Sequence, residues 1–312
     1  MEQIKVLSLD GGGVKGYLTA KILSNLEQYL NQQDNSNTPL GSRFDLIVGT
    51  STGGIIACAL AVGKTAKEIL ELYQLLIPEV FQPISCGYLS AKYSNKKLKE
   101  YLEDLLGEKT LGDVKTHLCA TSVCIENSSP RFHKSGYFER NLARLDERLV
   151  DVALATSAAP TFFPSVNTKH STNLTDGGVV ANNPSMVALI DALELTDNNF
   201  ENITMVSVGT GEQCHMPYSV SKLEKSGKVN WMVMNGLTPS KKTGSPLIEI
   251  FLESQSKLIH FQTQFLLKKN YIRINPKLSF EIELDDANKI ESLKNIADTT
   301  KEEIEKVLTL LS

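Results

Sequence analysis

Short strand patterns alternate with helix patterns through the first two hundred residues, and this alternation restricts the fold more than any other feature of the sequence. Apolar runs typical of strands cover residues 4–9, 44–49, 117–125 and 202–209. Helical patterns lie between them, at about 15–31, 53–62, 94–106 and 147–156. Parallel strands need long crossover connections, which are usually helices. The sequence therefore predicts an α/β fold with three layers, α/β/α, around a mostly parallel central sheet.

The pattern changes in the last third of the chain. Residues 212–245 are irregular and rich in Ser, Lys and Gly. After them the sequence predicts two helices, at about 246–268 and 286–310, around the short strand YIRI. Because no linker interrupts the chain, we expect an α/β core over 1–211 with a helical C-terminal portion, 212–312, packed on the same domain.

The bulk composition is ordinary for a globular protein and excludes some function classes. Of the 312 residues, 41% are hydrophobic and 22% are charged, and the formal net charge is −4 with a pI of about 5.8. A general nucleic-acid-binding protein would carry a basic stripe, so no nucleic-acid partner is expected. The five cysteines are scattered, odd in number and without C-x-x-C spacing, which favours buried thiols at Cys58, Cys119 and Cys124.

The pentapeptide from Gly49 to Gly53, GTSTG, has the G-x-S-x-G pattern of a nucleophile elbow, in which a serine occupies a sharp turn between a strand and a helix. A buried strand pattern precedes it and an apolar helix pattern follows it, as an elbow requires. The N-terminus of that helix would stabilise a developing anion at Ser51 by about 0.3–2 kcal/mol. The alternative is a tight glycine turn in which Ser51 only caps the helix.

The heptapeptide from Asp10 to Gly16, DGGGVKG, directly follows the first strand. Consecutive glycines let backbone N–H groups approach a ligand closely and point the same way, as in an oxyanion hole. Lys15 either adds positive charge there or is a solvated lysine at the start of a helix. The spacing of Gly11, Gly13 and Gly16 also fits a dinucleotide fingerprint. That fingerprint requires an acidic residue about 20 positions later, at the end of a second strand, and the sequence has a helix and a polar loop instead.

A third glycine-rich motif, TDGGVVANNP at residues 175–184, places Asp176 before Gly177 and Gly178. The two glycines permit a tight turn from which the aspartate side chain projects into a cleft. Asp-Gly turns are frequent in proteins, so this motif alone is a weak indication of catalysis.

The three motifs together, in this order, resemble those of the patatin-like phospholipase family. That family carries a D-G-G-G-x-[RK]-G anion hole, a G-T-S-x-G elbow and a D-G-[GA] aspartate, and SAAPTFFP at 157–164 resembles its segment between elbow and aspartate. The C-terminal segments that begin VNWMVM and NYIRINP resemble those of plant patatins. The resemblance covers nearly the whole chain and implies a patatin-like fold.

Carried over residue by residue, the resemblance implies a serine–aspartate dyad with Ser51 as the nucleophile and Asp176 as the general base. The oxyanion hole would be formed by the N–H groups of four residues: Gly11, Gly12, Gly13 and Thr52. The other family motif positions are Asp10, Lys15, Gly16, Gly49, Gly53, Gly177 and Gly178. The implied chemistry is attack on a lipid ester, an acyl-enzyme on Ser51 and its hydrolysis by water that Asp176 activates.

No cluster of histidine, cysteine or carboxylate residues has metal-ligand spacing, so the sequence predicts no metal, no cofactor and activity independent of calcium and zinc. The resemblance implies a phospholipid or galactolipid substrate, phospholipase A or lysophospholipase activity, and peripheral contact with a membrane surface. The candidates for that contact are Trp231, Met232 and Met234, and the alternative for them is a helix turn that faces the core. Without a signal pattern or a membrane-spanning run, we expect a cytoplasmic protein with transient membrane association. The sequence does not indicate an oligomeric state.

Two other functions stay open. An aspartate with an ordinary pKa of about 3.9 is a poor base for an alcohol unless desolvation raises the pKa. A soluble-ester hydrolase or acyltransferase would instead use His215, which completes a Ser–Asp–His chain order. The remaining histidines are His117, His133, His170 and His260. A storage protein or ligand-gated effector with incidental hydrolysis is the third reading, and it rests on family analogy.

Overall fold

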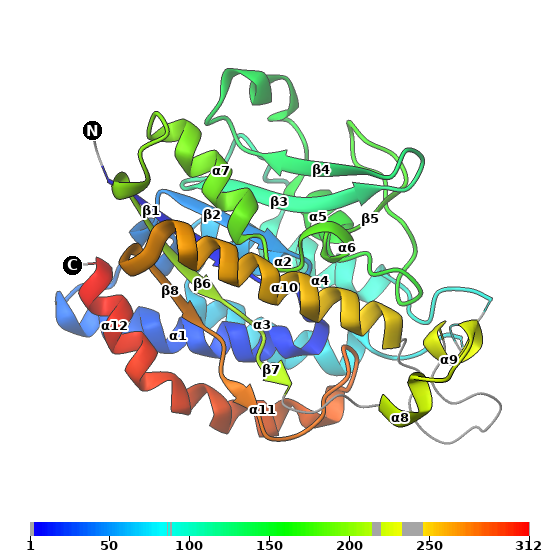
Figure 1. The fold of residues 1–312 in the computed structure, drawn as a ribbon. Helices are drawn as coiled ribbons and strands as arrows, with labels where there is room; N and C mark the ends of the chain where they lie inside the picture. The colour runs from blue at the N-terminus through cyan, green and yellow to red at the C-terminus, as the bar shows by residue number, and fades with distance from the viewer. Residues whose placement is uncertain (1–2, 86, 88, 214–219, 233–245, 312) are drawn as a thin grey trace.

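A seven-stranded sheet forms the centre of the computed structural model, which describes residues 3–85, 87, 89–213, 220–232 and 246–311 (Figure 1). The strands follow the order β4–β3–β2–β1–β6–β8, and β5 also pairs with β3. Their bounds are β1 Ile4–Leu9, β2 Leu46–Thr50, β3 His117–Cys124, β4 Ser129–Lys134, β5 Leu174–Asp176, β6 Ile203–Val208 and β8 Tyr271–Ile274. A separate two-stranded ladder joins β7 (Glu212–Gln213) to β9 (Lys277–Leu278).

The sheet is mostly parallel, as predicted. β1, β2, β3, β6 and β8 run parallel to one another, whereas β4 and β5 are both antiparallel to β3. Neither β4 nor β5 was predicted from the sequence, because β4 reads SPRFHK and β5 has only three residues. The antiparallel β5 ends at Asp176, so it carries a predicted site residue to the sheet.

Helices cover both faces of the sheet (Figure 1). One face packs against α1 (Gly16–Gln33), α2 (Thr52–Ala61), α5 (Leu149–Thr156) and the C-terminal helices α11 (Ile290–Ala297) and α12 (Lys301–Leu311). α3 (Ala66–Val80) and α4 (Lys96–Leu106) extend that layer. The opposite face packs against α7 (Ser185–Leu195) and α10 (Pro246–Leu267). Shorter helices are α6 (Gly178–Ala181), α8 (Val220–Leu223) and α9 (Lys228–Met232).

Alternating side chains of the central strands form the two cores. Leu7 and Ile47 belong to the core with α1 and α2, whereas Val6 and Leu46 belong to the core with α7 and α10. This division follows from the period of two in a strand, which directs successive side chains to opposite faces. Both faces of the central strands are therefore buried, which explains why the sequences of these strands are almost continuously apolar.

The C-terminal portion contributes a strand to the main sheet. β8 pairs in parallel with β6, with Met205 opposite Tyr271 and Val208 opposite Ile274. The single helix expected at 286–310 is wrong, because a 3-10 turn at Asp298–Thr300 divides it into α11 and α12. α12, red in Figure 1, lies beside the blue α1.

The predicted buried thiols are confirmed for three cysteines. Cys58, Cys119 and Cys124 are free and buried, and the other two cysteines lie outside the described residues. None of the helices in the described ranges combines the length and the apolar character needed to cross a membrane.

Candidate active site

The predicted motifs meet at the carboxyl ends of the parallel strands. Asp10 directly follows β1 and Ser51 directly follows β2, and these two strands are neighbours. After β1 the chain first builds the sheet towards β2 and β3 and later adds β6 on the other side of β1. In open α/β sheets, ligands bind in the crevice outside the strand ends at such a reversal of strand order.

Ser51 has the backbone of a strained elbow. Its φ of 55° and ψ of −125° place a residue with a side chain in the left-handed half of conformational space. Such a conformation persists only when the surroundings hold it. Ser51 N–H donates a hydrogen bond of 2.9 Å to Thr156 Oγ1 at the end of α5, and Ser51 C=O accepts from Gly54 N and Ile55 N at the start of α2.

Glycine is required on both sides of the elbow because β1, β2 and α2 approach closely. A Cβ on Gly49 would lie 2.3 Å from the Gly53 carbonyl oxygen, and one on Gly53 would lie 2.4 Å from the Leu9 carbonyl oxygen. Both distances are far below van der Waals contact, and the obstructing atoms are backbone. The backbone at residues 49–53 therefore has the geometry of the predicted G-x-S-x-G elbow. Both glycines are required because neighbouring backbone atoms leave no room for a side chain.

Ser51 and Asp176 are directly hydrogen-bonded. Ser51 Oγ donates to Asp176 Oδ2 at 2.5 Å, and Gly178 N–H donates to Asp176 Oδ1 at 2.6 Å. Burial raises the pKa of Asp176 to about 6, against the lowering effect of these two hydrogen bonds. A carboxylate with this pKa is a far better match to an alcohol proton than an exposed aspartate, and about nine-tenths of it is ionised at pH 7.

The glycine loop after β1 offers two free amides beside Ser51. Within the described part of the chain, the N–H groups of Gly12 and Gly13 make no hydrogen bond, and both residues line the same cavity as Ser51. The third predicted donor is not free. Gly11 N–H donates to the Asn182 carbonyl at 2.9 Å, so this residue holds the loop in place instead of facing an oxyanion.

Thr52 completes this set of amides. As the first residue of α2, Thr52 has an N–H with no acceptor inside the helix, and the residue lines the cavity. Its side chain is fixed by Tyr73 of α3, whose hydroxyl lies 2.6 Å from Thr52 Oγ1 and donates to the Thr52 carbonyl at 2.9 Å. Gly12, Gly13 and Thr52 thus all line the same cavity as Ser51.

Lys15 is buried, so the reading of it as a solvated lysine is wrong. Its side chain is 5% exposed and lies near Glu249 and Glu253 of α10 and near Asp10. Burial lowers the pKa of Lys15, and these three carboxylates oppose that effect. Lys15 is not among the residues that line the cavity.

A largely apolar cavity of about 610 Å³ contains Ser51, Asp176, Gly12 and Gly13 in its wall. Its volume lies within the range of about 300–1,000 Å³ of small-molecule sites. The apolar part of the wall comes mainly from α3, α10 and the segment before β5: Tyr73, Leu76, Ile77, Val80, Phe81, Phe162, Phe163, Ile248, Phe251, Leu252 and Leu258. Phe251 and Leu258 are 63% and 54% exposed, so they form part of the rim.

The four described histidines do not line this cavity. His133 is buried between Glu147 and Ser122, with 2.8 Å to each, and His170 pairs with Asp146 at the surface. His260 lies 3.2 Å from the Tyr271 hydroxyl, and His117 begins β3. His215, the alternative base, lies outside the described residues.

The predicted membrane-contact residues are described only in part. Trp231 is partly buried and Met232 is 45% exposed at the end of α9, and neither lines the cavity. Met234 lies outside the described residues. Across the residues with assigned positions, no group of three or more His, Cys, Asp or Glu side chains has a metal-binding arrangement.

Sequence reasoning missed the residues that hold the site together. Thr156 and Tyr73 fit ordinary helical patterns, and nothing local marks their contacts with Ser51 and Thr52. Thr121 on β3 is similar, because its hydroxyl lies 2.7 Å from that of Thr50. A Cβ on Gly177 would lie 2.0 Å from Thr121 Oγ1, which explains the glycine after Asp176.

Comparisons with known proteins agree with these motifs. The patatin-like phospholipase family model matches residues 7–189. Patatin-like protein 1 of Arabidopsis thaliana is 33% identical over an alignment 315 positions long, gaps included, that covers 87% of this chain and 74% of that protein. A cGAMP-activated phospholipase of Vibrio cholerae is 31% identical over an alignment 323 positions long, gaps included, that covers 95% of this chain and 88% of that protein. The crystal structure of VipD from Legionella pneumophila aligns with a TM-score of 0.46 and 15% identity over 98% of this chain and 67% of that chain.

Proposed function

The chain belongs to the patatin-like phospholipase family, and we propose that it is a lipid acyl hydrolase that cleaves ester bonds of membrane lipids through Ser51 and Asp176. Family membership supports lipid hydrolysis in general. The observation that carries the specific proposal is the 2.5 Å hydrogen bond from Ser51 Oγ to Asp176 Oδ2 in the wall of an apolar cavity.

In the proposed first half-reaction, Asp176 accepts the hydroxyl proton of Ser51 as Oγ attacks the ester carbonyl carbon. The negative charge that forms on the carbonyl oxygen faces the N–H groups of Gly12, Gly13 and Thr52. Removal of one such donor typically costs about 2.7–4 kcal/mol of transition-state stabilisation. Collapse of the intermediate breaks the ester C–O bond, and the leaving alcohol takes the proton from Asp176, which leaves an acyl-enzyme on Ser51.

In the second half-reaction, Asp176 takes a proton from a water molecule that attacks the acyl-enzyme. The same amides stabilise the second oxyanion, and Ser51 leaves with the proton as the free fatty acid forms. The aspartate acts as the base in both steps without a histidine, because burial raises the pKa of its carboxyl to about 6. We therefore propose that catalysis needs neither calcium nor zinc nor another cofactor.

The apolar wall favours an acyl chain as the group that enters the cavity. α3 and α10 present aliphatic and aromatic side chains to it, so an alkyl chain would be removed from water on binding. Phospholipids and galactolipids are the proposed substrates.

Contact with the bilayer is proposed through the outer face of α10, next to the rim of the cavity. Phe251, Leu258 and Phe265 recur at intervals of seven residues on this helix, with Phe261 between them, and all four are more than half exposed. Large exposed apolar side chains grouped at the opening of a lipid site suit a peripheral membrane surface. Met232 of the neighbouring α9 adds to this surface.

A ligand-gated effector is the second candidate, and the similarity to a cGAMP-activated phospholipase favours it. Under this proposal the same dyad cleaves lipids only when a cyclic dinucleotide is bound. Fatty-acid release measured with and without cGAMP separates the two: constitutive activity that cGAMP leaves unchanged rejects the gated form.

The decisive experiment is fatty-acid release from mixed phospholipid and galactolipid vesicles in EDTA, with and without cGAMP. Wild type should be active, and both Ser51→Ala and Asp176→Asn should lose activity while remaining folded. Asp197→Asn is the matched control, because Asp197 is exposed in the loop between α7 and β6. Activity that survives in Ser51→Ala contradicts the nucleophile, and activity lost in EDTA contradicts metal independence.

A further inference from the structure

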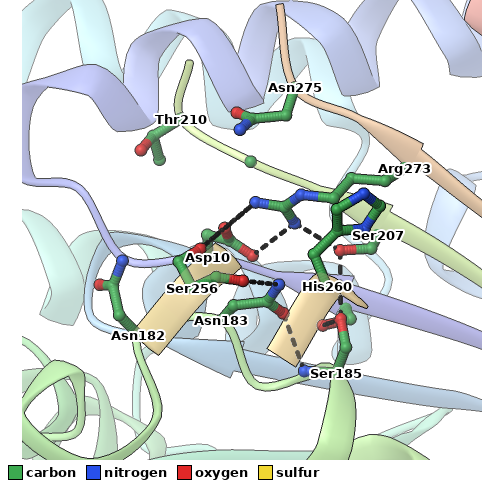
Figure 2. A network of polar contacts seen from close by, with 12 residues as sticks. Asp10, Asn182, Asn183, Ser185, Ser207, Thr210, Ser256, His260, Arg273 and Asn275 are labelled. Atoms are coloured by element: carbon green, nitrogen blue, oxygen red, sulfur yellow. Dashed lines mark hydrogen bonds and ion pairs between the residues drawn. The ribbon is translucent and has the colours of Figure 1, made fainter. Parts of the chain in front are cut away.

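Arg273, a buried arginine from the C-terminal portion, forms a salt bridge with Asp10, the residue that begins the proposed oxyanion loop (Figure 2). Asp10 directly follows β1 and precedes Gly11, Gly12 and Gly13. Arg273 of β8 donates from Nη2 to Asp10 Oδ2 at 2.6 Å and from Nη1 to Asp10 Oδ1 at 3.2 Å. The Asp10 side chain is 3% exposed and the Arg273 side chain 8%, so this two-pronged pair is shielded from water.

The Arg273 guanidinium makes a further hydrogen bond to the sheet. Nη1 also donates to Ser207 Oγ on β6 at 2.7 Å, and Ser207 Oγ accepts from Ser185 Oγ at 3.1 Å. On the other side, Ser256 Oγ of α10 donates to Asp10 Oδ2 at 3.2 Å. Figure 2 shows Arg273 and Asp10 between the side chains from β6 and α10. The guanidinium therefore has one orientation, fixed by the sheet and by α10 together.

The free amides of the loop depend on such anchors. Gly12 and Gly13 make no hydrogen bond of their own through N–H within the described residues, as their proposed role requires. Backbone bonds fix the loop on either side of them: Asp10 N–H to Val208 O at 3.1 Å, and Val14 N–H to Leu284 O at 2.8 Å. Between these points, other contacts tie the turn to the rest of the fold: Gly11 N–H donates to Asn182 O, Thr210 Oγ1 donates to Gly11 O at 3.3 Å, and the carboxylate of Asp10 binds Arg273.

Charge gives Arg273 a second effect. Asp10 Cα lies at most about 7.6 Å from Gly12 Cα, the length of two virtual bonds, so Asp10 is an acidic residue within the oxyanion loop itself. An unpaired buried carboxylate at that range would repel the oxyanion and would itself be strongly destabilised. With Arg273 bound to it, the pair is close to neutral, and the field of the amides acts on the oxyanion unopposed.

We infer that Arg273 is a positioning residue for the oxyanion hole: it fixes Asp10, and through it the amides of Gly12 and Gly13, and it neutralises the Asp10 carboxylate. This inference rests on the proposed function of Ser51 and Asp176. Arg273 lies beyond the residues 7–189 that match the family model, so the catalytic loop depends on a strand from the last fifth of the chain.

The test compares Arg273→Met, Arg273→Lys and the double variant Asp10→Asn/Arg273→Met on a soluble short-chain ester. Arg273→Met should lower kcat by about 100-fold, as loss of one oxyanion donor does, with KM changed less than threefold. Arg273→Lys keeps the charge without the fork and should retain at least a tenth of kcat. The double variant removes the buried charge and should recover at least tenfold over Arg273→Met. Arg140→Met is the matched control, since Arg140 pairs with Glu194 at the surface.

Each rate is referred to the folded fraction, measured by circular dichroism and by the amplitude of the thermal transition. If Arg273→Met fails to fold, Arg273→Lys and the double variant carry the comparison. A kcat of Arg273→Met within threefold of wild type per folded molecule overturns the inference, as does a kcat below a tenth of wild type in Arg273→Lys or in the double variant, and a loss confined to melting temperature shows a purely structural role. Activity that survives in Ser51→Ala would instead reject the proposed function, so the two failures are distinct.

Discussion

Replacement of the proposed base should stabilise the protein while it abolishes activity. Asp176→Asn preserves the size of the side chain, and the Asn amide oxygen can still accept from Gly178 N–H while its NH₂ group donates to Ser51 Oγ. What it removes is a buried charge. Burial raises the pKa of Asp176 from an ordinary 3.8 to about 6, a difference that corresponds to about 3 kcal/mol.

The sign of the pH dependence follows from linkage. A carboxyl whose pKa is higher in the folded than in the unfolded state binds more protons when folded, so folding stability falls as pH rises between those two pKa values. Below pH 3.8 the penalty is absent, and above pH 6 it is present in full. Asp176→Asn should therefore raise the free energy of unfolding by up to about 3 kcal/mol at pH 8 and by much less near pH 4.

Urea denaturation of wild type and Asp176→Asn at pH 4.5 and pH 8 measures this difference, together with fatty-acid release at pH 8. The exposed Asp197→Asn serves as the control and should show no gain that depends on pH. An Asn variant that is less stable than wild type at pH 8, or a difference that is the same at both pH values, refutes the reasoning that burial sets the basicity of Asp176.

Four further outcomes are expected. The kcat/KM for a soluble ester should rise through an apparent pKa of about 6 and level off above pH 7, and a flat pH–rate profile from pH 5 to 8 contradicts Asp176 as the base. Thr156→Val removes the acceptor of Ser51 N–H and should cost about 1–3 kcal/mol in urea denaturation and lower kcat, whereas Thr156→Ser should restore both. Gly53→Ala places a methyl group 2.4 Å from the Leu9 carbonyl oxygen, so thermal melting should show a clearly lower Tm and a fluorophosphonate should label Ser51 more slowly; unchanged labelling speaks against the close approach. Phe265→Asp should weaken co-sedimentation with phosphatidylcholine vesicles and leave kcat on a soluble ester unchanged, and equal sedimentation removes α10 from the membrane contact.

Local sequence patterns predicted the parallel strands of the main sheet and the sharp turn at Ser51. β1 runs from Ile4 to Leu9, as its apolar run predicts, and Ser51 occupies the strained turn that its glycine neighbours require. These features depend on residues within a few positions of each other, so the sequence displays them directly. β4 was missed because an edge strand with the sequence SPRFHK has no alternation of apolar and polar residues.

Contacts between distant segments could not be predicted in the same way. Ser51 and its partner Thr156 are 105 residues apart, and Asp10 and Arg273 are 263 residues apart. Gly11 is an example in which a distant contact made a local prediction wrong. Its place in the glycine motif suggested a free amide, but Gly11 N–H donates a hydrogen bond to the carbonyl of Asn182, from another segment of the chain.

The apolar cavity links substrate binding to the strength of the base. The walls that would hold an acyl chain also keep water from Asp176, and this desolvation is the largest cause of its raised pKa. A histidine would supply a base of suitable pKa even in contact with water, whereas an aspartate acquires one only where water is excluded. An acyl chain that fills the cavity removes further water, so the bound lipid should make Asp176 a stronger base than it is in the free protein. α10 contributes to all three parts of the proposed site. Its side chains form one wall of the cavity, which would hold the acyl chain and shields Asp176 from water, and its Ser256 hydrogen-bonds to Asp10 at the start of the oxyanion loop.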